Sequence, residues 1–341
     1  MLNKTVTKEL DTPGVMSTGA PVSSIEPRNR LRTLVNRVRE DEVARLLTLV
    51  VASLVVLITL LLFLALWSAS AVSRHKFGFA FLINSVWDPV LEEFGALPFI
   101  YGSLVTTILA LTIAVPLGVG AAVFLAELAP RRVSDALQFF IDLLAAVPSV
   151  VYGLLGILLV VPIMREYVQP GLKASLGFLP LFQGPAYGVC FLTAGIVLAI
   201  MVIPYIISVS REVLLSVPTE QREAALALGS TKWEATWKVV LPYARTGIFG
   251  SIFLAMARAL GETMAVTMVI GNSPKISSSL FSSGDSIASV IANQFAEATS
   301  EIHSQALIEL GLILFFLTFI LNGSARLLIL FTSKRGSALH A

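Results

Sequence analysis

The chain has 341 residues, of which 56% are hydrophobic and only 13% are charged. Water-soluble domains carry about 25% charged residues, so this composition excludes an ordinary soluble globule and indicates that lipid surrounds most of the chain. The formal net charge of +2 is too small to indicate a nucleic-acid partner.

The N-terminal region is predicted to precede the membrane. Residues 1–30 are rich in Thr, Ser, Pro and Gly and lack apolar periodicity, which is typical of a disordered tail. In residues 31–45, apolar residues recur at helical spacing among arginines, which predicts an amphipathic helix on the membrane surface. A solvated charge run leading into the membrane is an equally good interpretation. The first apolar run begins near Leu46, far from Met1, and is too long for a cleaved signal peptide.

Six apolar segments follow, each long enough for the roughly 20 helical residues that cross a bilayer. We therefore predict an all-α integral membrane protein with a transmembrane domain over residues 46–331, a cytoplasmic loop over 210–243 and a cytoplasmic tail over 332–341. Prolines within the spans, such as Pro148, are expected to kink or break them. The predicted spans are about 46–67, 98–126, 137–163, 187–209, 244–271 and 306–330.

The positive charges predict the orientation. Cytoplasmic segments of membrane proteins are enriched in Lys and Arg. If the N-terminus lies inside the cell, 18 of the 24 Lys and Arg residues fall in the inner segments and 5 in the outer ones. Both termini are therefore predicted to be cytoplasmic.

The 24th basic residue, Arg258, lies inside the predicted fifth span, with Glu262 four positions later. A lone charge at the bilayer centre costs at least about 2.5 kcal/mol, so such a residue faces protein or water. Helical spacing would let Glu262 pair with Arg258. We interpret the pair as a charged station on the path of an anionic or polar solute, and a structural salt bridge between helices is the alternative.

The loop 210–243 carries a spaced motif. Glu223, Ala224 and Ala225 are followed after three residues by Gly229, and after nine more by the sequence Val-Val-Leu-Pro. Gly229 suits a left-handed residue after a helix end, and the small alanines would let the helix enter a groove on another protein. Arg222 and Glu223 are expected to offer charges to that partner, and Thr219 is a candidate N-cap.

This motif resembles the EAA loop of the permease subunits of bacterial ABC importers, with Val239 where the family has isoleucine. The resemblance implies a type I importer transmembrane domain (MetI-like). It also implies that the loop helix docks on an ATP-binding subunit through Arg222, Glu223, Ala224, Ala225 and Gly229. The sequence contains no Gly-rich loop ending in Gly-Lys-Ser or Gly-Lys-Thr that would bind ATP phosphates, so the chain is expected to be a transport subunit without its own ATPase site, cofactor or metal.

Three stretches narrow the resemblance to the PstC-type permeases of phosphate importers: residues 94–107 (FGALPFIYGSLVTT), 145–153 (AAVPSVVYG) and 258–268 (RALGETMAVTM). This resemblance implies import of inorganic phosphate, with Arg258 and Glu262 on its pathway. The implied partners are a PstA-type second permease, two PstB-type ATP-binding subunits and a PstS-type phosphate-binding protein outside the membrane. The implied location is the bacterial inner membrane, among lipid. The role of Asp142 stays open.

Two alternatives remain. A permease for another oxyanion, such as sulfate or molybdate, would need the same loop and a similar charged pair. An ion-coupled secondary transporter also uses broken helices and charges near the membrane centre, but it needs no EAA loop. A membrane enzyme is disfavoured because His75, His303 and His340 are scattered along the sequence.

Overall fold

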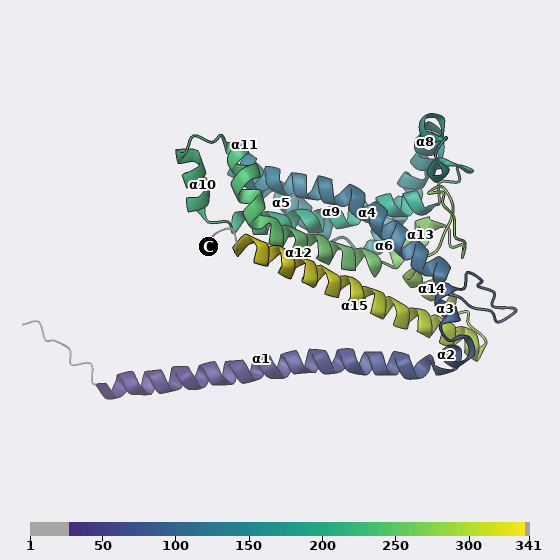
Figure 1. Cartoon of the computed structure of the whole chain (residues 1–341), viewed down its shortest axis with the longest axis horizontal. Helices are drawn as coiled ribbons and strands as arrows, with labels where there is room; N and C mark the ends of the chain where they lie inside the picture. Colours follow the sequence, from purple (N-terminus) through teal and green to yellow (C-terminus); the bar gives the residue numbers. More distant parts are fainter. Residues whose placement is uncertain (1–26, 338–341) are drawn as a thin grey trace, which may run out of the picture. The chain divides into compact units, whose positions relative to one another are not determined.

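The computed structural model describes residues 27–337, which are helical apart from their connections and one isolated bridge between Asp88 and Glu93 (Figure 1). The chain divides into two compact units, Met1–Leu61 and Leu62–Ala341. The all-α prediction is confirmed. Within residues 27–337, six helical stretches are long and apolar enough to cross a membrane: Glu42–Ala69, Leu97–Leu128, Ser149–Leu176, Phe191–Leu215, Lys232–Leu260 and Glu301–Ser324.

The first helix, α1 (Pro27–Ala69), runs from the first unit into the second. Most of the predicted tail, residues 1–26, lies outside the described residues, as do residues 338–341 of the C-terminal tail. Residues 27–30 belong to α1, so the tail prediction is wrong there, because proline is tolerated in the first turn of a helix. The predicted surface helix 31–45 continues into the first span without a break, since no glycine or proline interrupts it.

The third span begins later than predicted. Residues 131–145 form a separate helix, α5 (Arg131–Ala145), and the span itself starts at Ser149 with α6 (Ser149–Leu155). The prediction of one span over 137–163 is therefore wrong. Pro148 explains the break, because its ring disfavours helical geometry at the preceding residue and it carries no amide hydrogen for a continuing helix.

The segments after α6 complete the third and fourth spans. The chain continues through η2 (Gly156–Val160), α7 (Val161–Ile163), η3 (Met164–Val168), α8 (Gln169–Leu176) and η4 (Pro180–Phe182). It then enters α9 (Phe191–Leu215).

Helix α9 is the core of the second unit. It packs on α4 (Leu97–Val123) through small side chains such as Ala110 and Ala114, which let the two backbones approach closely. Within its apolar window, 61% of the α9 residues are buried in the chain itself, against 28% or less for the other five candidate spans. Helices α4, α5, α12 (Leu241–Leu260) and α13 (Met264–Ile270) pack directly on α9, whereas α15 (Glu301–Ser337) packs on α12 and α14 (Ile287–Gln294).

The fifth span also differs from the prediction. It is built from α11 (Lys232–Ala235), η5 (Thr236–Val240) and α12 (Leu241–Leu260), and it ends at Leu260 instead of continuing to residue 271. A break at residues 261–263 separates it from α13 (Met264–Ile270). Gly261 ends α12, which fits the weak helix propensity of glycine.

Several short helices lie at the two ends of the second unit, and the last long helix runs along it. α10 (Thr219–Ala227) and α11 are at one end of the helical bundle, and α8 and α14 (Ile287–Gln294) are at the other, while α15 (Glu301–Ser337) runs beside α12 (Figure 1). The remaining elements are α2 (Ala71–Phe77), α3 (Ala80–Ile83) and η1 (Phe124–Leu128), a π-helical turn that continues α4.

One close backbone contact joins α4 to the segment before α14. A β-carbon built on Gly102 would lie 1.8 Å from the carbonyl oxygen of Asp285, so only glycine fits at this position. Asp285 is 3% exposed, and its carboxylate accepts a hydrogen bond from the Ser286 amide at 2.9 Å. Burial raises the pKa of Asp285 from 3.8 to about 6, and hydrogen bonds from Ser289 and Ser286 oppose this shift.

Candidate functional site

The motif in loop 210–243 forms a short helix at one end of the bundle. α10 begins at Thr219 and its N-cap is Pro218, so the prediction that Thr219 is the N-cap is wrong. Pro218 takes the extended conformation that an N-cap needs, which moves Thr219 into the first helical position. At the other end Gly229 has φ +86°, as expected for the left-handed residue that follows a helix.

The predicted partner-facing residues of α10 divide into two faces. Glu223, Ala224 and Gly229 are exposed, while Ala225 is buried against the chain. The prediction that Arg222 offers its charge to a partner protein is wrong, because the charge is paired within the chain. Its side chain is 20% exposed and forms an ion pair with Glu127 of η1, with Nη2 2.8 Å from Oε1. The exposed part of α10 therefore carries two negative charges, Glu220 and Glu223, beside the small side chain of Ala224.

A capped turn connects α10 to the fifth span. The Thr231 hydroxyl accepts a hydrogen bond from the Glu234 amide at 3.3 Å, and the Glu234 carboxylate accepts one from the Thr231 amide at 3.0 Å. This reciprocal capping box fixes the start of α11. Trp233 and Trp237 follow on one side with their ring centroids 5.7 Å apart, and both are exposed.

The second predicted site, Arg258 with Glu262, does not form a pair along one helix. Arg258 lies in the last turn of α12, whereas Glu262 lies in the break before α13. In the described part of the chain, no ion pair or hydrogen bond joins them. Glu262 instead accepts a hydrogen bond from the Ala265 amide at 3.2 Å, which satisfies a donor at the start of α13. The prediction of pairing at helical spacing is wrong because the helix ends between the two residues.

Arg258 is exposed on the surface of the chain, and Glu262 is half-buried. The guanidinium of Arg258 is close enough to Tyr152 of α6 to interact with it electrostatically. The Tyr152 hydroxyl donates to the carbonyl of Leu144 at 2.7 Å and so bridges the break at Pro148. Arg258 therefore stands near both helix breaks and is exposed on the surface of its own chain.

The two helix breaks lie side by side. α6 packs on α13, and a β-carbon on Gly153 would lie 3.1 Å from the α-carbon of Ala265 and 2.5 Å from the sulfur of Met268. These residues belong to two of the stretches on which the sequence resemblance rests, and no pattern in the sequence predicts their contact. Glycine at position 153 permits the close approach of the two broken helices.

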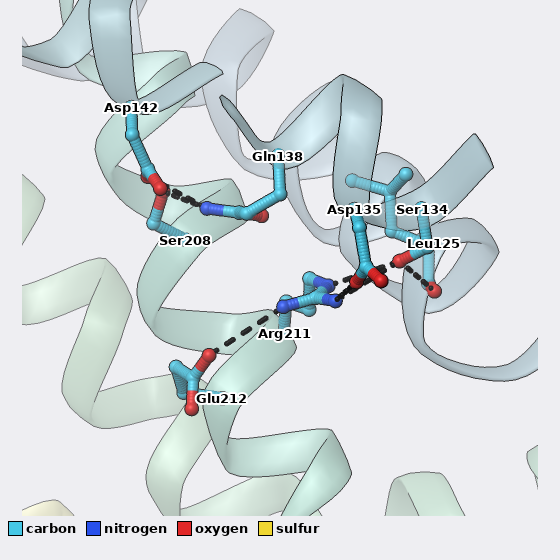
Figure 2. Close-up of polar contacts among 8 residues, drawn as sticks. All are labelled: Leu125, Ser134, Asp135, Gln138, Asp142, Ser208, Arg211 and Glu212. Atoms are coloured by element: carbon cyan, nitrogen blue, oxygen red, sulfur yellow. Dashed lines mark hydrogen bonds and ion pairs between the residues drawn. The ribbon is translucent and has the colours of Figure 1, made fainter. Parts of the chain in front are cut away.

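A polar seam between α5 and α9 was not predicted (Figure 2). Asp142, whose role the sequence left open, accepts hydrogen bonds from Gln138 at 2.6 Å and from Ser208 of α9 at 2.8 Å. One turn further along α9, Arg211 donates to Ser134 at 3.0 Å and lies 3.4 Å from Asp135. The available signal was the helical spacing of Ser134, Asp135, Gln138 and Asp142, but the predicted span over 137–163 divides this pattern.

The described residues contain no group of three or more His, Cys, Asp or Glu side chains that could hold a metal ion. An exposed arginine beside two helix breaks can attract an anion, and an exposed helix of small residues at one end of the bundle can seat in another protein.

Known proteins resemble this chain over most of its length. Residues 114–332 match the family described as binding-protein-dependent transport system inner membrane component. The phosphate transport system permease protein PstC of Xylella fastidiosa is 47% identical over 294 residues, covering 85% of this chain and 90% of the relative. PstC of Pasteurella multocida is 50% identical over 267 residues, covering 77% and 83%. A solved structure of the MetNI methionine ABC transporter matches with a TM-score of 0.49 and 14% identity, covering 72% of this chain and 99% of that one.

Proposed function

The chain belongs to the binding-protein-dependent transport system inner membrane components and, among them, to the PstC permeases, and we propose that it carries inorganic phosphate into the cell. It is a multi-pass membrane protein and a permease subunit of an ABC importer with other subunits, and it is a transport component and not itself an enzyme. Its fold is that of the type I importer permeases, as the sequence predicted. ATP is hydrolysed by another subunit, and this chain supplies the passage.

The 50% identity to a phosphate permease over 267 residues carries the assignment of the solute. The charged residues alone do not choose phosphate, because Arg258 would attract any oxyanion. Sulfate and molybdate therefore remain the alternative solutes that the experiment must exclude.

Within this function, Arg258 and Glu262 are assigned to the solute pathway. A charge in a membrane span must face protein or water, because lipid solvates it poorly. Arg258 is exposed on its own chain, so a second permease subunit of PstA type is expected to face it and to enclose a polar passage between the two subunits. Glu262 accepts a hydrogen bond at the start of α13 and would thereby maintain the break between α12 and α13 near that passage.

The exposed face of α10 is assigned to coupling with the ATP-binding subunits. Glu223 and Ala224 are exposed on this face, and Ala225 and Gly229 hold the helix and its end in shape. Two ATP-binding subunits of PstB type would engage this chain and its PstA-type partner. A phosphate-binding protein of PstS type would deliver the solute at the other end of the bundle, where α8 and α14 lie (Figure 1). The chain would then lie in the inner membrane with both termini in the cytoplasm.

The test is ATP hydrolysis by the reconstituted complex in lipid vesicles. Binding protein loaded with phosphate is expected to stimulate hydrolysis and to drive phosphate into the lumen, while binding protein presented with sulfate or molybdate leaves hydrolysis at its basal rate. Equal stimulation by sulfate or molybdate would refute the phosphate assignment. Phosphate uptake driven by an ion gradient without any ATP-binding subunit would refute the ABC mechanism for this chain.

A further inference from the structure

The ion pair of Arg222 connects α10 to the end of the second span. Besides the 2.8 Å contact between Nη2 and Oε1, the Nε of Arg222 lies 3.2 Å from each carboxylate oxygen of Glu127. The two side chains are 20% and 10% exposed, respectively. A planar guanidinium that engages both oxygens of a largely buried carboxylate fixes direction as well as distance, which a lysine in the same place would not do.

The same guanidinium also binds the end of α9. Its Nη2 donates to the carbonyl of Leu214 at 2.7 Å, and its Nη1 donates to the carbonyl of Val217. Carbonyls near the end of a helix have few partners within the helix, so a side-chain donor can bind them, here at Leu214 in the last turn of α9 and at Val217 just after it. One side chain of α10 thereby joins three segments: α10 itself, η1 and the end of α9.

Apart from the bonds of Arg222, α10 packs mainly on the neighbouring α11 and η5. It has nine residues, and a helix of that length is marginal in water without tertiary contacts. Ala225 is its one buried residue within the helix. Arg211 of α9 also reaches η1, because it donates to Ser134, which in turn donates to the carbonyl of Leu125 at 2.8 Å (Figure 2). Two arginines, Arg211 and Arg222, thus contact η1 directly or through Ser134, and both line one cleft of about 590 Å³.

We propose that Arg222 is a positioning residue that locks the coupling helix α10 to η1 through Glu127 and to the end of α9 through the carbonyls of Leu214 and Val217. A force applied to the exposed face of α10 by an ATP-binding subunit would then move the ends of α4 and α9 together. Without the lock, α10 would tilt independently of α4 and α9, and ATP would be hydrolysed without opening of the passage. This inference rests on the proposed function, because it needs an ATP-driven partner at α10.

The main test measures phosphate transported per ATP hydrolysed in reconstituted complexes. Arg222→Gln and Glu127→Gln are each expected to lower this ratio by about fivefold or more, the lower range of coupling between sites. The double variant should be no worse than the more severe single one, because both changes remove the same contact. Lys238→Gln is the matched control, since it removes a positive charge from an exposed pair with Glu234. An unchanged ratio in Arg222→Gln, or additive losses in the double variant, would overturn the proposal.

A second measurement separates this lock from the proposed function itself. Spin labels on Leu226 of α10 and Arg132 of α5, both exposed positions, report the distance between the coupling helix and the α5 side of the bundle. The distance distribution in the full chain is expected to broaden in Arg222→Gln and to stay narrow in Lys238→Gln. A distribution that Arg222→Gln leaves unchanged would overturn the lock, whatever solute the complex transports. Failure of phosphate to stimulate the unaltered complex would count against the proposed function alone.

Discussion

Gly102 offers a sharp test of how the second unit is packed. Alanine at this position places its β-carbon 1.8 Å from the carbonyl oxygen of Asp285 and 2.9 Å from the carbonyl carbon. A carbon and a carbonyl oxygen normally come no closer than about 3.3 Å, so α4 and the segment before α14 must separate by about 1.5 Å. Neither atom belongs to a flexible side chain that could move aside.

The expected cost of Gly102→Ala is about 1–3 kcal/mol, as for overpacking elsewhere in protein interiors. The matched control is Gly120→Ala in the same helix, where an added β-carbon meets nothing within 4 Å. That control should be neutral or stabilising by about 0.5–1 kcal/mol, because alanine is the better helix former. Each variant adds one methyl group to α4, so a difference between their unfolding temperatures reports the contact with Asp285.

The assay is thermal unfolding of the purified chain in detergent, followed by its tryptophan fluorescence. Gly102→Ala is expected to unfold at a lower temperature than the unaltered chain, and Gly120→Ala at the same or a higher one. Equal unfolding temperatures for the two variants would refute the close approach of α4 to residue 285.

Three further predictions concern titration, coupling and the solute. The pKa of Asp285 is about 6 in the folded state, above its ordinary value of 3.8, so the folded chain keeps this carboxyl protonated over a pH range in which the unfolded chain ionises it. The free energy of unfolding is therefore expected to fall by about 3 kcal/mol as the pH rises from about 4 through 6. Asp285→Asn should remove that part of the pH dependence of thermal unfolding, and an unaltered pH profile would contradict this prediction. Glu223→Lys should reduce copurification of the ATP-binding subunit severalfold while membrane insertion stays normal, and an intact complex would exclude Glu223 from the contact. Arg258→Gln should leave assembly intact and depress phosphate uptake about tenfold or more, as expected for loss of a charge-assisted anion contact, whereas normal uptake would exclude Arg258 from the pathway.

The spans could be predicted from the sequence because apolar runs of sufficient length leave few alternatives in a bilayer. All six appear in the structure, but the third and fifth are shifted. In both, apolar residues continue past a break, so hydropathy could not locate the helix ends. The local signals were Pro148 and Gly261, and only the first was recognised as a breaker.

In the candidate sites too, local features could be predicted from the sequence, whereas contacts between distant segments could not. Gly229 was assigned correctly because a positive φ follows from local helix chemistry. Arg222 was assigned outward, although it turns inward, because its partner Glu127 lies 95 residues earlier and no local pattern links them. The pairing of Arg258 with Glu262 failed for a related reason, since it assumed an unbroken helix. Contacts between distant segments are decided by packing, which a single sequence does not reveal.

The enclosure of α9 has a consequence for how the protein responds to its bilayer. A helix with most of its surface covered by its own chain has little contact with acyl chains, so a thicker or thinner membrane strains it only through its neighbours. The outer helices must absorb such mismatch by tilting, while α9 keeps its length and direction. Changes in lipid composition should therefore act first on the peripheral spans and reach the ends of α9 last.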